Sequence, residues 1–191
     1  QKDLLNIVYL CRHYGLNEAA NYWEQVIFLN EWQKSRISKL VIETFFGTVS
    51  SKKIVILGFS FKSNTNDTRY SPSISIAKDL MENGANLFIH DPKVTREQIS
   101  DSLDKQNEQI NSTAQNSWHF EKDLNLIFKD AEAILILTEW QEYSSLNWKD
   151  ISDLMRKPAW VFDTRGIICD SDLSETQLNF WKIGRGIIRD N

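Results

Sequence analysis

Three cationic side chains follow apolar runs in this chain, in positions where loops can hold an anion. Lys62 lies four residues after Gly58, which itself ends the apolar run 54–57, and Arg69 comes later in the same loop. Arg165 follows a second apolar run, 159–162. In an open α/β sheet, the loops after parallel strands gather at one edge, where backbone N–H groups and cations bind phosphates. The spacing GxxxK differs from the dinucleotide fingerprint GxGxxG, so the pattern indicates an anion site without naming its ligand.

Each of these cations also has an ordinary structural interpretation. Lys62 fits a surface lysine that lies there by accident, and Arg69 fits a loop staple paired with Asp67. The planar fork of Arg165 suits bidentate contact with phosphate or sugar oxygens. Position alone leaves both interpretations open for Lys62 and Arg69.

Other titratable residues form no recognisable site. Asp91 ends the predicted strand 86–90, where dinucleotide-binding folds place a ribose-binding acid. It lies 33 residues after Gly58, however, and Pro92 follows it, which favours a structural turn. The histidines are scattered and show no metal-ligand spacing, so we predict no metal. Cys11 and Cys169 match no disulfide or zinc pattern.

The elements that must position the cations alternate between strands and helices. Strands are predicted at 54–57, 86–90, 118–120, 133–137, 159–162 and 180–183. Helices are predicted at 72–83, 122–128, 140–143 and 148–155, with a weak helix and a mobile insertion over 95–113. This alternation predicts an α/β fold, with a Rossmann-like, largely parallel sheet and helices on both faces.

A helical segment precedes this α/β region. Apolar spacing predicts a first helix that Gly15 ends, then a second helix that Asn17 caps and that continues to about Phe46. Thirty residues of helix span roughly 45 Å, which is typical of a helix that links domains or forms a dimer interface. A helix packed only on its own domain is the alternative. We divide the chain into a helical central or dimerisation segment, 1–50, and an α/β domain, 51–191.

Composition and charge exclude several function classes. The chain has 191 residues, of which 41% are hydrophobic and 25% charged, as in an ordinary globular protein. A net charge of −4 without a basic stripe argues against nucleic acid as a partner. No apolar run reaches the roughly 18 residues that a membrane span requires. With no signal pattern at the start, a cytoplasmic protein is the expectation.

Several segments resemble one known family. The stretch GFSFKSNTNDTRYSPS, 58–73, resembles the start of the UDP-binding domain of UDP-glucose 6-dehydrogenases, within the UDP-glucose/GDP-mannose dehydrogenase family. Four more segments fall where that family has its own versions: QKDLLNIVYLC at 1–11, HDPKV at 90–94, TEW at 138–140 and FDTRG at 162–166. The resemblance covers nearly the whole chain and looks closest to the eukaryotic enzymes.

The resemblance implies an NAD-dependent enzyme that oxidises UDP-glucose to UDP-glucuronate by two hydride transfers through a cysteine thioester. In the family, that cysteine and the NAD-binding domain lie upstream of the residues that Gln1, Lys2 and Asp3 match. The chain is therefore expected to be the C-terminal part of such an enzyme and to be inactive alone. The alternatives are a catalytically inert module that binds a nucleotide sugar, or an assembly piece with a degenerate α/β domain.

The resemblance also implies roles in substrate binding. Phe61 and Lys62 match residues that contact UDP-glucose, and Arg165 matches an arginine that completes the UDP-sugar site of a neighbouring subunit. Thr164 departs from the family, where a glycine is usual. A β-branched residue resists positive φ, so this departure is expected to change the turn and the aim of Arg165.

Further roles concern catalysis, the cofactor and assembly. Asp3 matches the aspartate that orders or activates water beside the cysteine, while Gln1, Lys2 and Arg69 match residues near NAD. Tyr70 stands where animal enzymes have an acid, which changes the charge balance of the loop. The family dimerises through the long helix, so a homodimer or a hexamer is expected.

Overall fold

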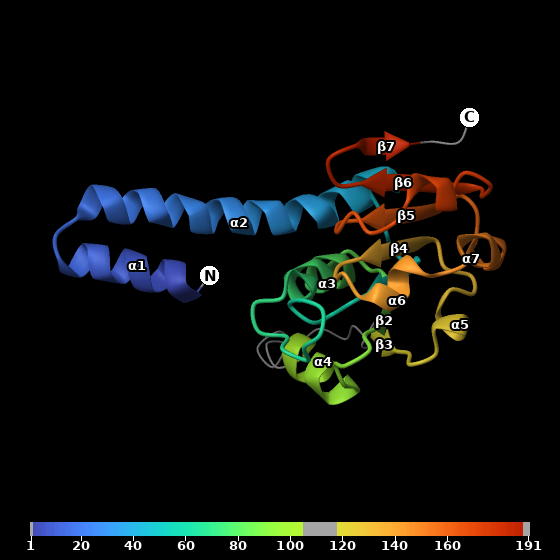
Figure 1. Ribbon diagram of the computed structural model, residues 1–191, viewed down its shortest axis with the longest axis horizontal. Coiled ribbons are helices and arrows are strands. Elements are labelled where there is room, and N and C mark those ends of the chain that lie inside the picture. The colour runs from blue at the N-terminus through green and yellow to red at the C-terminus, as the bar shows by residue number, and fades with distance from the viewer. Residues whose placement is uncertain (1, 105–117, 189–191) are drawn as a thin grey trace. The chain divides into compact units, whose positions relative to one another are not determined.

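The chain forms two compact units in the computed structural model, which describes residues 2–104 and 118–188 (Figure 1). The first unit is Gln1–Gly47 and the second is Thr48–Asn191. None of the helices in these described ranges is long and apolar enough to cross a membrane.

The first unit is a pair of helices. α1 (Lys2–His13) is followed by Gly15, which takes a φ of +73°, and α2 (Asn17–Thr44) then runs back beside α1 (Figure 1). Nη2 of Arg12 donates to both carboxylate oxygens of Glu24, at 2.9 and 2.8 Å, and so ties α1 to α2. The 28 residues of α2 span about 42 Å, close to the predicted length.

The predicted cap of α2 is wrong by one residue. Leu16 occupies the N-cap position, and no side chain caps the helix there. Asn17 is already helical, so its side chain cannot take the N-cap role, which requires non-helical backbone.

The second unit contains one seven-stranded sheet with the order β3-β2-β1-β4-β5-β6-β7. Its strands are β1 (Lys53–Leu57), β2 (Asn86–His90), β3 (Trp118–Phe120), β4 (Ala133–Ile136), β5 (Ala159–Asp163), β6 (Leu178–Lys182) and β7 (Gly186–Ile188). The first six are parallel, and β7 pairs antiparallel with β6. This order is that of a Rossmann-like sheet, so the predicted fold class is confirmed.

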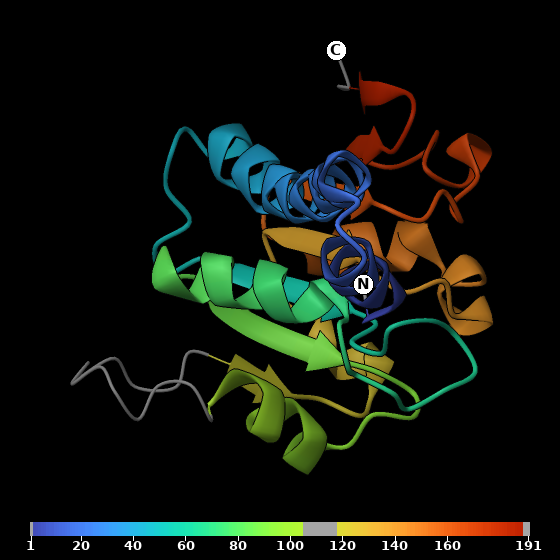
Figure 2. The same ribbon diagram turned by 90° about the vertical axis from the view of Figure 1, so that its left-hand side faces the viewer.

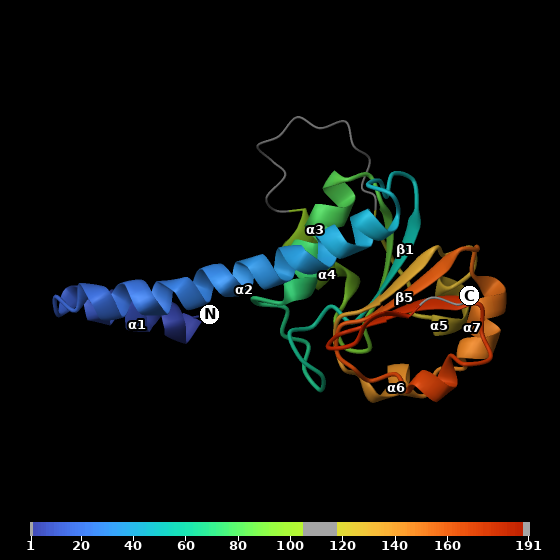
Figure 3. The same cartoon turned by 90° about the horizontal axis from the view of Figure 1, so that it is seen from above.

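Helices cover both faces of this sheet. They are α3 (Pro72–Glu82), α4 (Arg96–Leu103), α5 (Leu124–Ile127), α6 (Gln141–Ser144) and α7 (Trp148–Leu154), with a 3-10 turn, η2 (Asp170–Asp172), before β6. α3 and α4 lie on one face, and α5, α6 and α7 lie on the other (Figures 2 and 3). Every residue of β4 and β5 is buried, as expected for parallel strands covered on both sides.

Local sequence explains where α3 and α4 begin. The Ser71 side chain accepts a hydrogen bond from the backbone N–H of Ser73, and Pro72 occupies the first turn of α3, where its missing N–H costs nothing. Thr95 and Gln98 form a capping box at the start of α4, with the two side chains bonded reciprocally to backbone N–H groups. The insertion predicted after α4 lies mostly at 105–117, outside the described residues.

Two predictions about secondary structure are wrong. The helix predicted at 122–128 is a single turn, α5, which begins only after Asp123 caps it by accepting from the N–H of Asn125. The strand predicted at 180–183 is not the last, because Gly184, with a φ of +84°, turns the chain back into β7. Three residues are too few to show a period-2 pattern, which is why the sequence did not reveal β7.

Candidate nucleotide-binding site

The loops that carry Lys62 and Arg165 start at the carboxyl edge of the sheet, on strands β1 and β5 with β4 between them. β1 lies between β2 and β4: the chain adds β2 and β3 on one side of β1, then crosses back to add β4, β5 and β6 on the other side. Such a switch point at the carboxyl edge is where open α/β sheets bind ligands.

Gly58 makes a close turn directly after β1. Its φ is +94°, and a Cβ atom built there would lie 2.4 Å from Cβ of Thr138, the residue that follows Leu137 at the end of β4. Only glycine accepts both the backbone angle and the contact. The Thr138 hydroxyl then donates to the carbonyl of Ser60 at 2.7 Å, so the start of the loop is fixed against β4.

The loop presents Phe61 and Lys62 to solvent. Phe61 is 48% exposed, and its N–H donates to the carbonyl of Asp67 at 2.8 Å, which closes the loop on itself. Lys62 is exposed beside it. The loop therefore offers an apolar ring and an ammonium together at the edge of the sheet.

Arg69 is held by an acid of its own loop. Its Nε and Nη2 donate to the two carboxylate oxygens of Asp67, at 2.9 and 2.7 Å, and this bidentate pair lowers the pKa of Asp67 to about 2. This pairing with Asp67 is the structural interpretation of Arg69 that the sequence left open. The Arg69 side chain is nevertheless 82% exposed, and its Nη1 is not engaged by Asp67.

A buried carboxylate shapes the loop of Arg165. Asp163, the last residue of β5, accepts from the backbone N–H groups of Arg165 at 3.0 Å and Gly166 at 2.7 Å through one oxygen, and from that of Ile168 at 2.9 Å through the other. Gly166 takes the positive φ of this turn, +73°.

Thr164 fits this turn without the strain that a positive φ would impose on it. It is absent from the described residues with positive φ, and its hydroxyl donates to the carbonyl of Ile136 at 2.6 Å. Its β-branched side chain therefore meets no left-handed backbone, and it ties the turn to β4.

Glu139 connects the two cationic loops. Its Oε2 lies 3.4 Å from Nε of Arg165, which also donates to the carbonyl of Leu137 at 2.7 Å. Its Oε1 accepts from the backbone N–H of Ser63, the neighbour of Lys62, at 3.5 Å. Glu139 does not cap the next helix, α6, because Trp140 occupies that N-cap position without a side-chain bond.

Asp91 is turned into the protein. It is 4% exposed, and its carboxylate accepts from the N–H groups of Phe59 and Ser60 at 2.8 and 2.9 Å. It also accepts from the N–H groups of Lys93 and Val94, both at 2.9 Å, and from Nε1 of Trp140 at 3.3 Å. With both oxygens engaged in this way, Asp91 serves the structural turn that the sequence favoured and not a ribose hydroxyl.

A buried histidine and tyrosine lie beneath the same edge. Nδ1 of His90 lies 2.9 Å from the hydroxyl of Tyr143, which also meets the His90 carbonyl at 3.1 Å. Burial lowers the pKa of His90 and raises the pKa of Tyr143, because both charged forms lose their water. The pair therefore stays neutral and acts as a support for the loops above it.

Apart from Arg69, the residues predicted near the cofactor and the nucleophile belong to the first unit. Lys2 and Asp3 lie in the first turn of α1 and are exposed. Gln1 lies outside the described residues. Within the described ranges, no cluster of three metal-ligating side chains is present.

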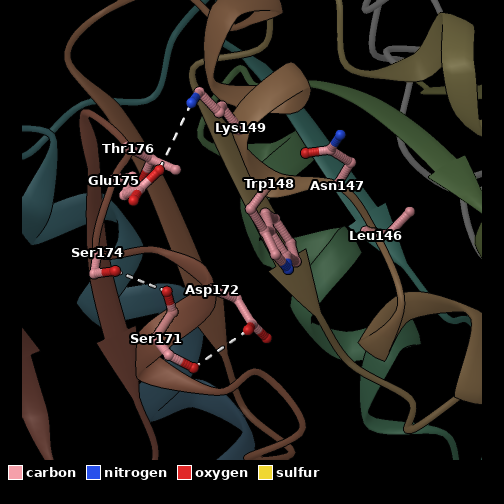
Figure 4. A pocket seen from close by; sticks show the side chains of 9 residues that line it. All are labelled: Leu146, Asn147, Trp148, Lys149, Ser171, Asp172, Ser174, Glu175 and Thr176. Atoms are coloured by element: carbon pink, nitrogen blue, oxygen red, sulfur yellow. Dashed lines mark hydrogen bonds and ion pairs between the residues drawn. The ribbon is translucent and has the colours of Figure 1, made fainter.

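A separate cavity of about 270 Å³ lies between residues 146–149 and the segment 171–176 (Figure 4). Its charged lining residues are Lys149, Asp172 and Glu175, and Lys149 pairs with Glu175 at 3.6 Å. Two carboxylates against one engaged ammonium disfavour a diphosphate ligand. None of the predicted ligand-binding residues lines this cavity, so it is separate from the candidate site at the carboxyl edge of the sheet.

Comparison with known proteins identifies the family of this chain. The profile of the UDP-glucose/GDP-mannose dehydrogenase family, UDP binding domain, matches residues 55–170, which include both cationic loops. The chain belongs to this family. "UDP-glucose 6-dehydrogenase 4" of Arabidopsis thaliana is 40% identical over 194 residues, and "UDP-glucose 6-dehydrogenase" of Drosophila melanogaster is 42% identical over 190. Each match covers 97% of this chain, which spans only 40% and 39% of these relatives.

Solved structures of related enzymes show the same fold. A UDP-glucose dehydrogenase from Pyrobaculum islandicum superposes with a TM-score of 0.65 at 25% identity, over 85% of this chain and 32% of that one. A GDP-mannose dehydrogenase from Pseudomonas aeruginosa superposes with a TM-score of 0.64 at 19% identity, over 87% of this chain and 35% of that one. The second likeness concerns the fold alone.

Within this member of the UDP-glucose/GDP-mannose dehydrogenase family, the structure adds three acids that sequence reasoning did not place in the site. They are Asp91, Glu139 and Asp163, and each lies at or just after the end of a strand. The sequence signal that could have identified them is an acidic residue at or shortly after the end of an apolar run. Glu139 gave the weakest signal, because its partners, Ser63 and Arg165, are distant in sequence.

Proposed function

We propose that the α/β unit binds the uridine diphosphate part of a nucleotide sugar, and that the protein serves as the UDP-binding part of an NAD-dependent UDP-glucose 6-dehydrogenase. The main support is the presence of Lys62 and Arg165 on loops of the same sheet edge, with Glu139 in reach of both loops. Phe61 adds an exposed ring next to the ammonium. This combination suits a ligand that has both a diphosphate and flat or apolar surfaces.

The proposed task of this unit is to hold the remote part of the substrate. Lys62 and Arg165 neutralise charge on the diphosphate, with Arg165 acting either on the same site or on that of a neighbouring subunit. Binding energy gained at the diphosphate offsets the loss of translational freedom of the substrate. The sugar is thereby held in position although these contacts lie far from the reacting carbon. The protein oxidises that carbon in two hydride transfers, from UDP-glucose to UDP-glucuronate.

NAD supplies the hydride acceptor in this proposal, and Arg69 fits a place beside it. With Asp67 bound to Nε and Nη2, the exposed guanidinium keeps Nη1 for an anion such as a cofactor phosphate. Gln1 and Lys2 are proposed as further NAD-binding residues. Asp3 is proposed as the group that orders water for the hydrolytic step.

Assembly is a further part of the proposal. Large apolar side chains of the first unit are exposed, among them Tyr9 at 68%, Tyr22 at 67% and Trp32 at 54%. Contact with a second copy would remove this apolar area from water. We therefore propose a homodimer or hexamer, in the cytoplasm, with the long helix as the contact element.

The binding proposal is tested by titrating UDP into the 191-residue chain and into Lys62→Met and Arg165→Met variants. A charge-assisted hydrogen bond contributes about 1.5–3 kcal/mol, so each loss should weaken UDP by roughly 10- to 100-fold. Lys149→Met is the matched control, because it also removes a surface charge but lies at the other cavity. Equal affinities in all four proteins would support a degenerate domain and contradict the proposal.

The catalytic proposal needs the full-length protein, mixed with UDP-glucose and NAD while NADH absorbance is followed. Two NADH per UDP-glucose consumed are expected from a four-electron oxidation. UDP binding without NADH would instead favour the alternative, a catalytically inert module for nucleotide sugars.

A further inference from the structure

Two buried aspartates lie at the strand ends from which the site is built. Asp91 follows β2 and is 4% exposed, and Asp163 ends β5 and is fully buried. Buried carboxylates usually pair with a cation or lose their charge. Although cations are near in both loops, neither carboxylate uses the side chain of Lys62 or Arg165.

Asp91 reaches across to a loop that is not its own. Its Oδ2 accepts from the N–H groups of Phe59 and Ser60, which directly precede Phe61 and Lys62. Its Oδ1 accepts from the N–H groups of Lys93 and Val94. One oxygen therefore holds the local turn, and the other holds the root of the loop that carries Lys62.

Asp163 also holds backbone N–H groups with both oxygens, but all of them belong to its own loop. Oδ1 accepts from the N–H groups of Arg165 and Gly166, and Oδ2 accepts from that of Ile168. The carboxylate bonds the backbone of Arg165, while its guanidinium points to the Leu137 carbonyl and Glu139.

We propose that Asp91 and Asp163 are positioning residues, each holding the backbone of one ligand-binding loop without pairing with the cation that the loop carries. Backbone N–H dipoles stabilise the two negative charges. Lys62 and the outer nitrogens of Arg165 consequently stay available for a diphosphate. This inference rests on the proposed function for the identity of the ligand.

Asparagine is the informative substitution at both positions, because it keeps the size and removes one acceptor. In Asp91→Asn, an amide NH₂ replaces one oxygen and faces the N–H donors that this oxygen accepted, two at Oδ1 or three at Oδ2 with Nε1 of Trp140. If the remaining oxygen keeps the local turn, the N–H groups of Phe59 and Ser60 lose their acceptor. In Asp163→Asn, the same change releases Ile168, or else Arg165 and Gly166.

The test combines UDP titration with residue-level amide hydrogen exchange, measured by NMR on the 191-residue chain. Loss of an acceptor raises local opening, so the affected amides exchange faster. Asp91→Asn should speed exchange at Phe59 and Ser60 and leave Arg165 and Gly166 unchanged. Asp163→Asn should speed exchange at Ile168, or at Arg165 and Gly166, and leave Phe59 and Ser60 unchanged, so each variant is the control for the other. Both should weaken UDP at least tenfold while Lys62 and Arg165 are intact.

Ile127→Ala controls for general loss of stability. Ile127 is fully buried in α5, before β4, and belongs to neither loop. Its substitution should lower the unfolding temperature but leave UDP affinity unchanged at a temperature where all variants are folded. An equal loss of UDP affinity in Ile127→Ala would overturn the inference, since any destabilisation would then suffice.

The result that refutes positioning is unchanged UDP affinity in both aspartate variants, or faster exchange spread over the whole sheet. Failure of the proposed function has a different signature. In that case the unsubstituted chain would not bind UDP, while the exchange pattern would still decide whether each carboxylate holds its loop.

Discussion

The tight turn at Gly58 gives the sharpest prediction for stability. A Cβ atom there would lie 2.4 Å from Cβ, 2.7 Å from N and 2.7 Å from Oγ1 of Thr138. Thr138 cannot easily withdraw, because its hydroxyl bonds Ser60 and the adjacent Leu137 N–H donates to Leu57 at 2.9 Å. We expect Gly58→Ala to strain both the turn and the β1–β4 contact.

Two contributions add in Gly58→Ala. Left-handed backbone costs a residue with a Cβ atom about 1–2 kcal/mol, and overpacking a rigid site costs about 1–3 kcal/mol. The sum, roughly 2–5 kcal/mol, corresponds to a fall of about 4–20 °C in unfolding temperature for a protein of this size. The variant should also weaken the binding of UDP, because the displaced turn leads into the loop that carries Lys62.

Gly184→Ala separates the two contributions. Gly184 lies in the same unit with a φ of +84°, but a Cβ atom there would meet nothing within 4 Å. Only the backbone cost of about 1–2 kcal/mol should appear in this variant. Urea unfolding of both variants measures the difference, and equal losses of stability would refute the steric argument.

Three further predictions concern titration and burial. Stability should fall as pH drops below about 6.5, because burial lowers the pKa of His90 and the unfolded chain binds a proton that the folded chain excludes. Thermal unfolding between pH 7.5 and 5.5 measures this slope, which should flatten in His90→Gln; an unchanged slope there would assign the effect to other groups. Tyr143→Phe should cost about 1–3 kcal/mol in urea unfolding, because it leaves the buried His90 Nδ1 without its hydroxyl partner; full stability would contradict this buried contact. Asp67 should titrate near pH 2 by carboxyl NMR, since the Arg69 guanidinium lowers its pKa to about 2, and a midpoint near 3.8 in the folded chain would show that the pair does not form in solution.

The fold could be predicted from the sequence because its strongest signals are local. Apolar runs such as 133–137 and 159–162 mark strands buried on both faces, and the glycines and prolines between the elements mark the turns. The antiparallel strand β7 was missed, and the helix around α5 was predicted longer than its four residues, because short elements offer few positions from which to define a period and its limits.

The site could be predicted only in part, for a physical reason. Lys62 and Arg165 were found because each follows a strand, and the strand order then places both loops at one edge. The contacts by which Asp91 and Glu139 arrange these loops escaped, because they join residues distant in sequence. Asp91, for example, bonds the N–H of Phe59 from the next strand along the chain.

Because β4 lies between β1 and β5, the sheet backbone sets the distance between the loops that follow β1 and β5, and side chains do not control it. Two strand spacings of about 4.8 Å separate the roots of the loops that carry Lys62 and Arg165, which makes roughly 10 Å. Backbone hydrogen bonds fix that interval, so core substitutions can change stability without changing it. Substitutions of loop side chains can then change which ligand is preferred, while the sheet keeps the distance between the two loops constant.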